Sequence, residues 1–171
     1  VLVPEIGLTP QLLARFRERL PGPLAVLHSG LSDRERLHAW LSARSGVARV
    51  VVGTRSAVFA PLRAPGILIV DEEHDPSFKQ QDGFRYHARD LAVVRGRQLG
   101  IPVVLGSATP ALESRHNAER GRYRLLQLPE RVGGGAEAPI EILDVRRQPM
   151  VDGLSRPLLE RMRIHLARNE Q

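Results

Sequence analysis

An acidic cluster directly follows a run of apolar residues in the stretch ILIVDEEH, residues 67–74. A carboxylate at the end of a buried strand can hold a hydrated Mg²⁺ ion near phosphates, which assigns the metal to Asp71 through water. The next acid, Glu72, can orient or deprotonate an attacking water molecule. Acid pairs that only cap a turn are also common after strands, so both interpretations stay open. His74, two residues further on, favours the catalytic one.

A nuclease or metal hydrolase that uses Asp71, Glu72, Glu73 and His74 together is a further alternative. Consecutive residues at the end of a strand point in different directions, so the four side chains cannot all ligate one ion. The adjacency of these residues therefore disfavours that class of enzyme.

A phosphate-binding loop needs glycines for close backbone approach and a lysine that reaches the terminal phosphates. The one lysine among 25 basic residues is Lys79, which no glycine pattern surrounds. The glycine cluster at 133–135 has neither a lysine nor a following helix, and we interpret it as a flexible link. We therefore expect these 171 residues alone to hold ATP poorly.

Two further segments contain residue types that suit nucleic acid. The loop GTRSA offers Gly53 for close approach, Thr54 and Ser56 as donors and Arg55 as the charge. The segment DPSFKQQDGFRYHARD places aromatic between basic side chains, a pattern that suits stacking on unpaired bases. Its candidate residues are Phe78, Lys79, Phe84, Arg85 and Tyr86. A phosphate-free turn and a loop whose aromatic side chains close over the core are the respective structural alternatives.

Continuous Val, Ile and Leu runs alternate with amphipathic segments, which predicts an α/β fold with a parallel sheet between helices. The predicted strands are the end of one at 1–4 and the runs 24–29, 48–54, 66–73 and 101–109. Helices are expected after a Thr9 cap, after a Ser32–Glu35 capping box, and at 87–99, 111–121 and 155–169. Their expected apolar faces comprise Leu12, Leu13, Phe16 and Leu20; Leu37, Trp40 and Leu41; Leu91, Val94 and Leu99; and Leu158, Leu159, Met162 and Leu166.

Ligands of an open parallel sheet bind beyond the carboxyl ends of its strands. Polar groups follow each predicted strand there, so we expect them to converge at one edge of the sheet. They are Pro4 and Glu5, His28 and Ser29, Gly53 to Ser56, Asp71 to His74, and Ser107 with Thr109.

The composition is ordinary for one globular domain, with 42% hydrophobic and 26% charged residues. The absence of cysteine excludes disulfides and thiolate zinc sites within the chain. No apolar run approaches the roughly 20 residues that span a bilayer, so we expect a cytoplasmic protein without a membrane partner. The net charge of +6 permits a polyanionic partner, although a solvated arginine-rich surface has the same charge.

Five segments, taken in order, closely resemble the PriA group of replication-restart DNA helicases of superfamily 2. They are VLVPEIGLTPQ, VLHSGLSDRER, VVVGTRSAVFAP, ILIVDEEHDPSFKQQDGFRYHARDLAVVR and VVLGSATPALES. DEEH and SAT indicate only the superfamily, whereas GTRSAVFAP, the segment after DEEH and GSATPALES are specific to the group. The resemblance implies a RecA-like P-loop NTPase lobe, with ATP and Mg²⁺ as cofactors.

The resemblance implies a role for each matching residue. Asp71 and Glu72 match the Walker B acids, and His74 matches the last position of the DExH box, which links nucleotide state to the DNA path. The motif that couples hydrolysis to unwinding comprises Ser107, Ala108 and Thr109. The motifs on the DNA side are matched by Pro4, Glu5 and Ile6, by residues 53–56, and by the aromatic-rich loop at 78–86, which senses single-stranded DNA.

The resemblance further implies a 3′-to-5′ DNA helicase of replication restart, of which this chain is a piece. Its partners would be single-stranded and forked DNA, single-strand binding protein and other primosome proteins. The phosphate loop belongs before Val1, and the zinc-binding cysteines and second lobe belong after Gln171. We therefore expect the isolated chain to be inactive, with an exposed sheet edge or a gap where the phosphate-loop strand is missing. A non-catalytic DNA-binding or scaffold relative is the alternative.

The expected organisation has three parts. Residues 1–121 form a partial first lobe, residues 122–154 form exit strands with the Gly-rich linker, and residues 155–171 form a helix that leads toward the zinc region and second lobe. The first residue is Val1 rather than Met, which agrees with a piece of a longer protein.

Overall fold

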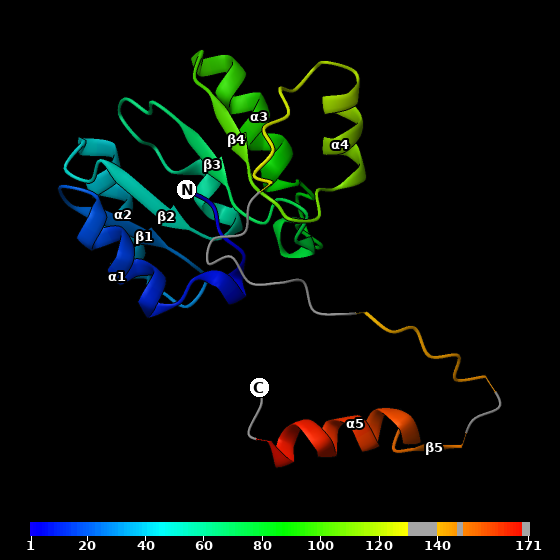
Figure 1. Cartoon of the computed structure of the whole chain (residues 1–171). Helices are drawn as coiled ribbons and strands as arrows, with labels where there is room; N and C mark the ends of the chain where they lie inside the picture. Colours follow the sequence, from blue (N-terminus) through cyan, green and yellow to red (C-terminus); the bar gives the residue numbers. More distant parts are fainter. Residues whose placement is uncertain (130–139, 147–148, 169–171) are drawn as a thin grey trace. The chain divides into compact units, whose positions relative to one another are not determined.

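The computed structural model describes residues 1–129, 140–146 and 149–168. Two compact units make up the chain, Val1–Leu125 and Leu126–Gln171, and each is described by itself (Figure 1). Within the described residues, no helix is long and apolar enough to cross a membrane.

A parallel sheet forms the centre of the first unit. β1 (Leu24–Leu27) pairs with β2 (Val50–Gly53), and β3 (Leu68–Val70) pairs with β4 (Val103–Leu105). Residues 1–3 lie between the two pairs, because Leu2 bridges both Gly53 and Val70 in parallel. The sheet order is therefore β1, β2, residues 1–3, β3, β4 (Figure 1). Four of the five predicted strands are present, each shorter than the apolar run that predicted it, and the predicted strand end at 1–4 is reduced to isolated bridges at Leu2.

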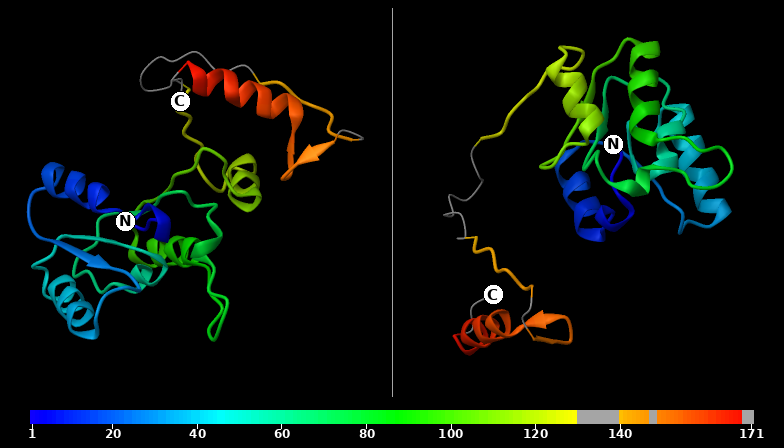
Figure 2. Two further views of the ribbon diagram at one scale, coloured as in Figure 1. Left: turned by 90° about the horizontal axis from the view of Figure 1, so that it is seen from below. Right: turned by 90° about the vertical axis from the view of Figure 1, so that its right-hand side faces the viewer.

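Helices cover both faces of this sheet. The helices of the first unit are α1 (Pro10–Arg19), α2 (Asp33–Ser45), α3 (Ala88–Leu99) and α4 (Leu112–Glu119). α1 and α2 lie on opposite sides of β1 (Figure 2), and α3 packs against β3 and β4. Three short 3₁₀ helices follow strand ends or begin loops: η1 (Glu5–Gly7), η2 (Arg55–Phe59) and η3 (Pro76–Phe78).

The predicted helix starts are confirmed by their caps. The Thr9 hydroxyl accepts a hydrogen bond from the Leu12 N–H at 3.2 Å. Ser32 and Glu35 form the complete capping box, in which each side chain accepts from the other residue's N–H. The hydrogen bonds from Ser32 also lower the pKa of the Glu35 carboxyl. Local sequence therefore determines where these two helices begin.

Of the residues predicted for the apolar faces of α2 and α3, Leu91 packs against the hydrophobic core and the others are exposed. Leu37, Trp40 and Leu41 of α2 are exposed, with Leu37 at 55%. In α3, Val94 and Leu99 are exposed, and the helix instead buries Ala88, Ala92 and Gly96. The physical reason is close approach, because a Cβ atom added at Gly96 would lie 2.1 Å from Val103 Cγ2. Small side chains let α3 lie directly on β4, and the longer ones project to the sides.

The second unit contains a short antiparallel hairpin and a helix. β5 (Met150–Val151) and β6 (Leu154–Ser155) pair across a turn at Asp152 and Gly153, both with positive φ. α5 (Arg156–Ala167) follows and buries no residue. Its predicted inward residues Leu158, Met162 and Leu166 are exposed, and Leu159 is half-buried. Residues 122–129 and 140–146 form no strand, contrary to prediction, and the 133–135 glycine cluster lies outside the described residues.

We predict that Gly96→Ala lowers the free energy of unfolding by about 1–3 kcal/mol, because the added methyl group forces α3 away from β4. Urea denaturation followed by circular dichroism measures this change. Gly66→Ala is the matched control, since nothing lies within 4 Å of a Cβ atom at that position. Equal unfolding midpoints for the two variants would contradict the close packing of α3 on the sheet.

Candidate functional site

The parallel sheet places the carboxyl ends of its strands at one edge, as the sequence predicted. Two groups of candidate residues gather there. One contains Asp71, Glu72, His74, Ser107 and Thr109, which follow β3 and β4. The other contains Glu5, His28, Ser29 and Thr54, which line a common pocket.

The acidic loop begins at the middle of the sheet. Asp71 N–H donates to the Leu2 carbonyl at 2.9 Å, and the Asp71 carboxylate accepts from the Glu72 N–H at 3.1 Å. Both acidic side chains are exposed. Glu72 adopts φ +46°, in the left-handed region that non-glycine residues occupy at a cost of about 1–3 kcal/mol, most often at functional sites. The loop thus presents two solvent-accessible carboxylates from a fixed backbone.

His74 joins the acidic loop to the segment after β4. Its Nδ1 atom lies 2.7 Å from Ser107 Oγ, and its Nε2 atom lies 3.5 Å from Thr109 Oγ1. Nδ1 is also 3.6 Å from a Glu72 carboxylate oxygen, an ion pair only when the ring is protonated. Thr109 N–H donates to Ser107 Oγ at 3.0 Å, and Ala108 between them is exposed. The structure therefore brings together residues that the sequence predicts to be catalytic with residues that it predicts to couple hydrolysis to unwinding.

Glu73 has a different environment from its neighbours, which the sequence did not predict. Its side chain is 1% exposed and accepts hydrogen bonds from Arg89, the Ala111 N–H and Ser114. No spacing rule connects Glu73 with these residues, because they follow it by 16, 38 and 41 positions in the sequence. Only the fold shows that the third acid of the cluster is internal.

The acidic loop fits a water-mediated magnesium site better than a direct one. Among the described residues, no three His, Asp or Glu side chains come together as a metal cluster. Mg²⁺ commonly binds one or two carboxylates while phosphates and water supply its other ligands. The single exposed carboxylate of Asp71, with Glu72 beside it, matches that donor set.

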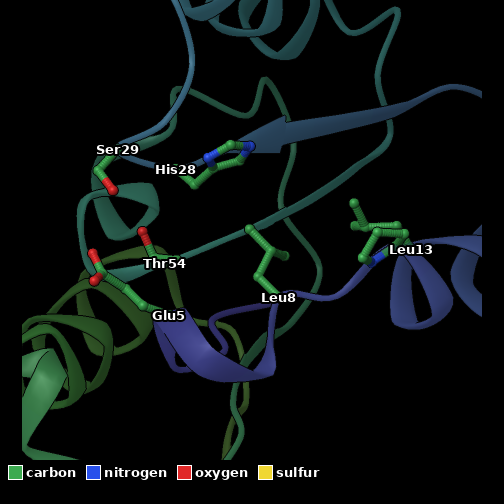
Figure 3. A pocket seen from close by; sticks show the side chains of 7 residues that line it. Glu5, Leu8, Leu13, His28, Ser29 and Thr54 are labelled. Atoms are coloured by element: carbon green, nitrogen blue, oxygen red, sulfur yellow. The ribbon is translucent and has the colours of Figure 1, made fainter.

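The second group of residues surrounds an open pocket of about 350 Å³. Figure 3 shows the Ser29 and Thr54 hydroxyls and the Glu5 carboxylate at one side, with Leu8 and Leu13 at the other. His28 Nδ1 accepts from the Gly30 N–H at 3.1 Å, which orients its ring. The pocket thus combines hydroxyl donors, an imidazole and an acid at the ends of residues 1–3, β1 and β2.

Two residues of the GTRSA loop that were predicted to bind nucleic acid, Arg55 and Gly53, make contacts inside the protein. Arg55 donates to the carbonyls of Ser77 and Lys79 at 3.1 and 3.0 Å, so its guanidinium holds the following loop. Gly53 packs closely against the Leu27 carbonyl. A Cβ atom at this position would lie 2.2 Å from the carbonyl oxygen, so only glycine fits there. Pro4 and Thr54 are buried, while Ser56 is exposed. Both residues therefore have structural contacts inside the protein, and their roles toward nucleic acid stay predictions.

Phe78 is buried completely and belongs to the hydrophobic core, which corrects its place among residues that stack on bases. Phe84 is 77% exposed and stacks on Tyr86 with ring centroids 5.9 Å apart. Tyr86 also contacts Phe59 edge-on at 5.0 Å. Phe59 is itself exposed and was missed by the sequence analysis, because 27 residues separate it from Tyr86. The aromatic surface comprises Phe59, Phe84 and Tyr86.

The loop that holds this surface closes as a narrow hairpin. Lys79 and His87 form an antiparallel bridge, and Gln80 N–H donates to the Tyr86 carbonyl at 2.9 Å. Lys79 Nζ donates to the Arg85 carbonyl at 3.2 Å, while the Arg85 side chain is exposed. Of the two predicted cations, Lys79 is therefore engaged within the loop and Arg85 faces solvent.

At the base of the loop, His87 caps α3, because its Nδ1 accepts from the Arg89 N–H at 3.3 Å. Burial lowers the pKa of His87 below its ordinary value, and the positive charge of Arg89 lowers it further. The cap therefore depends on a neutral ring whose protonation the surroundings disfavour.

Comparison with known proteins gives one consistent result. The family model for DEAD/DEAH box helicases matches residues 1–118. The chain belongs to the DEAD/DEAH box helicase family. This membership confirms the predicted α/β fold of the RecA-like type, which the parallel sheet and flanking helices also show.

Relatives within the family are replication restart proteins. The "Replication restart protein PriA" of Haemophilus influenzae is 51% identical over 171 residues, which is 100% of this chain and 23% of the relative. Those of Bacillus subtilis and Synechocystis sp. are 43% and 49% identical over 100% and 86% of this chain, and 22% and 18% of their own lengths. The resemblance to the PriA group is thereby confirmed, and the chain spans about a fifth to a quarter of these relatives.

We predict that His87→Asn flattens the pH dependence of stability. The unfolded chain protonates His87 near pH 6.5, above the lowered pKa of the folded state, so unfolding takes up a proton in this window. Stability therefore falls as pH drops from 6.5 toward the folded-state pKa, and removing the imidazole removes this loss. Asparagine keeps the cap.

Urea denaturation between about pH 5 and pH 8 measures the difference in slope between the wild type and His87→Asn. His38→Asn, at an exposed position of α2, is the control. A wild-type slope retained in His87→Asn would show that this ring does not contribute to the pH dependence.

Proposed function

We propose that this chain is the greater part of the first lobe of an ATP-dependent 3′-to-5′ DNA helicase that acts in replication restart. The observation that carries the proposal is the contact of His74 with Ser107 and Thr109. It connects an acidic loop suited to ATP hydrolysis with a second loop from the neighbouring strand. A change at the nucleotide can therefore move the segment after β4, which coupling of hydrolysis to DNA movement requires.

On the nucleotide side, the proposed roles follow from exposure and position. Asp71 would hold a hydrated Mg²⁺ ion, which would neutralise charge on the phosphates. Glu72, exposed and fixed in a left-handed conformation, orients the attacking water and accepts its proton. Because no glycine–lysine phosphate loop occurs in these 171 residues, that loop is proposed to come from a part of the longer protein outside them.

On the DNA side, the exposed aromatic surface and the pocket support two kinds of contact. Phe84 and Tyr86, with Phe59 behind them, offer a stacking platform for an unpaired base, and the exposed Arg85 adds a cation. Glu5, Thr54 and Ser56 lie at the same carboxyl edge as the acidic loop, where the sugar–phosphate backbone would pass. Arg55 and Lys79 hold the loop beneath this surface through hydrogen bonds to its carbonyls, and Phe78 anchors the loop in the core.

The wider assignment rests on the relatives named as replication restart proteins. The longer protein is proposed to act in the bacterial cytoplasm on forked and single-stranded DNA, with single-strand binding protein and other primosome proteins as partners. Zinc would be held by cysteines outside this chain, which contains none. Residues 122–154 and 155–171 are proposed to lead from this lobe toward that zinc region and the second lobe.

We predict that Glu72→Gln in the full-length gene product lowers kcat for DNA-stimulated ATP hydrolysis by about 100-fold or more, because water loses its general base. Glu18→Gln, at an exposed position of α1, is the matched control and retains the wild-type rate. Phosphate release measured with and without single-stranded DNA tests this. A full-length protein with no ATPase activity would reject the proposed function, and turnover by the 171-residue chain alone would reject its expected inactivity.

We predict that Phe84→Ala weakens binding of single-stranded DNA by about 1–3 kcal/mol, because one stacked base loses its platform. The substitution removes an exposed ring, so the free energy of unfolding should stay within about 0.5 kcal/mol of the wild type. Fluorescence anisotropy with a labelled oligonucleotide measures the affinity in the full-length protein. Leu112→Ala, an equally exposed apolar residue on α4, is the control, and equal affinities for both variants would contradict the assignment.

A further inference from the structure

Glu73 is the one fully buried residue of the acidic cluster. It is 1% exposed and, after Phe78, is the largest of the fully buried side chains in the described part of the chain. Its chain neighbours Glu72 and His74 are exposed and belong to the proposed hydrolytic machinery. A buried carboxylate is costly unless it is paired and hydrogen-bonded, so its partners define what it does.

The partners of the Glu73 carboxylate come from two places in the fold, the start of α4 and the first turn of α3. Ala111 N–H donates to Oε1 at 2.7 Å, while Ser114 Oγ and Arg89 Nη1 donate to Oε2 at 2.9 and 3.2 Å. Arg89 is itself buried and donates through Nε to Asp90 at 2.9 Å. Both carboxylate oxygens are therefore satisfied by strong donors, two of them neutral and one a guanidinium.

The contacts with Ala111 and Ser114 hold the start of α4. Ala111 is the N-cap residue of this helix and has no side chain that could cap it. The Glu73 carboxylate, from another strand end, accepts the N–H of this N-cap residue, as the N3 acid of a capping box does, and the positive end of the helix dipole favours an anion there. The Glu73 N–H also donates to the Gly106 carbonyl at 3.0 Å. Glu73 thus fixes both ends of the segment 106–114, within which Ser107 and Thr109 contact His74.

The contact with Arg89 extends the connection to the aromatic hairpin. Arg89 lies in the first turn of α3, and its N–H donates to His87, the residue that pairs with Lys79 at the base of the hairpin. One carboxylate therefore touches the segment after β4 and the helix that begins at the hairpin, while it belongs covalently to the acidic loop.

We propose that Glu73 is a positioning residue that holds three segments in a fixed relative position: the acidic loop, the segment 106–114 and the base of the aromatic hairpin. This fixed relative position is called the register below. Through this register His74 keeps its contacts with Ser107 and Thr109. The proposal rests on the proposed function for its consequence in catalysis, but the register itself is a property of this chain and can be measured without ATP.

Glu73→Gln tests the register because it keeps the shape and removes half of the acceptors. A glutamine side chain has one oxygen and one NH₂ group. Its NH₂ group must therefore face either the Ala111 N–H or the Ser114 and Arg89 donors, and the hydrogen bonds on that side are lost. Ser114→Ala is a milder variant that deletes one hydroxyl and leaves the buried ion pair intact. Glu113→Gln is the matched control, since this exposed acid lies 3.9 Å from the same Arg89 guanidinium.

Amide hydrogen exchange and the ¹⁵N signals of the His74 ring are measured by NMR on the 171-residue chain at fixed pH. In Glu73→Gln, exchange at the Ala111 amide should rise by about tenfold or more, and the His74 ring signals should move toward those of a free imidazole. Ser114→Ala should shift both in the same direction by less, which keeps the test valid if Glu73→Gln does not fold. Glu113→Gln should match the wild type.

A purely structural Glu73 would lower stability while the His74 ring signals of the folded variants stayed unchanged, and that result would overturn the proposal. Wild-type exchange at Ala111 in both variants would also overturn it. In the full-length protein, Glu73→Gln should reduce the DNA stimulation of ATP hydrolysis by about tenfold, with the KM for ATP unchanged; unchanged stimulation would overturn the catalytic consequence. A wild-type protein without ATPase activity would instead reject the proposed function and leave the NMR results valid.

Discussion

The backbone pairing of residues 1–3 is the constraint on which the site depends. Leu2 N–H donates to the Ile69 carbonyl at 2.7 Å, and the Leu2 carbonyl accepts from Asp71. On the other side, Val3 N–H donates to Gly53, whose own N–H donates back to Val1. These bonds join two separate strand pairs into one parallel sheet. They also fix the acidic loop and the GTRSA loop on either side of residues 1–3, because Asp71 and Gly53 are the residues that bond to this segment.

Close packing extends this order to the loops. Gly53 and Gly96 let Leu27 and Val103 approach where a methyl group would clash, and Phe78 fills the core beneath the aromatic hairpin. The exposed Phe84 and the half-buried Tyr86 therefore lie next to a closely packed core. Exposed functional side chains in this lobe are supported by buried neighbours only a few residues away in the chain.

Three arginines of the first unit make contacts inside the protein. Arg55 binds the carbonyls of Ser77 and Lys79, Arg89 binds Glu73 and Asp90, and Arg95 binds the carbonyls of Val58 and Ala60. The planar guanidinium suits such multiple contacts with fixed acceptors. These three side chains therefore stabilise the fold, while most of the other described arginines are exposed.

The sequence by itself determined the strands, the capped helix starts, the polar edge and the family, because these depend on local patterns and contiguous motifs. Thr9, Ser32 and Glu35 act through neighbours three residues away. Only the tertiary structure decided which aromatic rings are exposed and which acid is internal. Phe78 and Phe84 have the same side chain in one loop, and Asp71 and Glu73 stand in one cluster, yet their burial differs completely. The physical reason is that burial depends on partners such as Arg89 and Ser114, which are distant in sequence and meet only when the sheet and helices pack together.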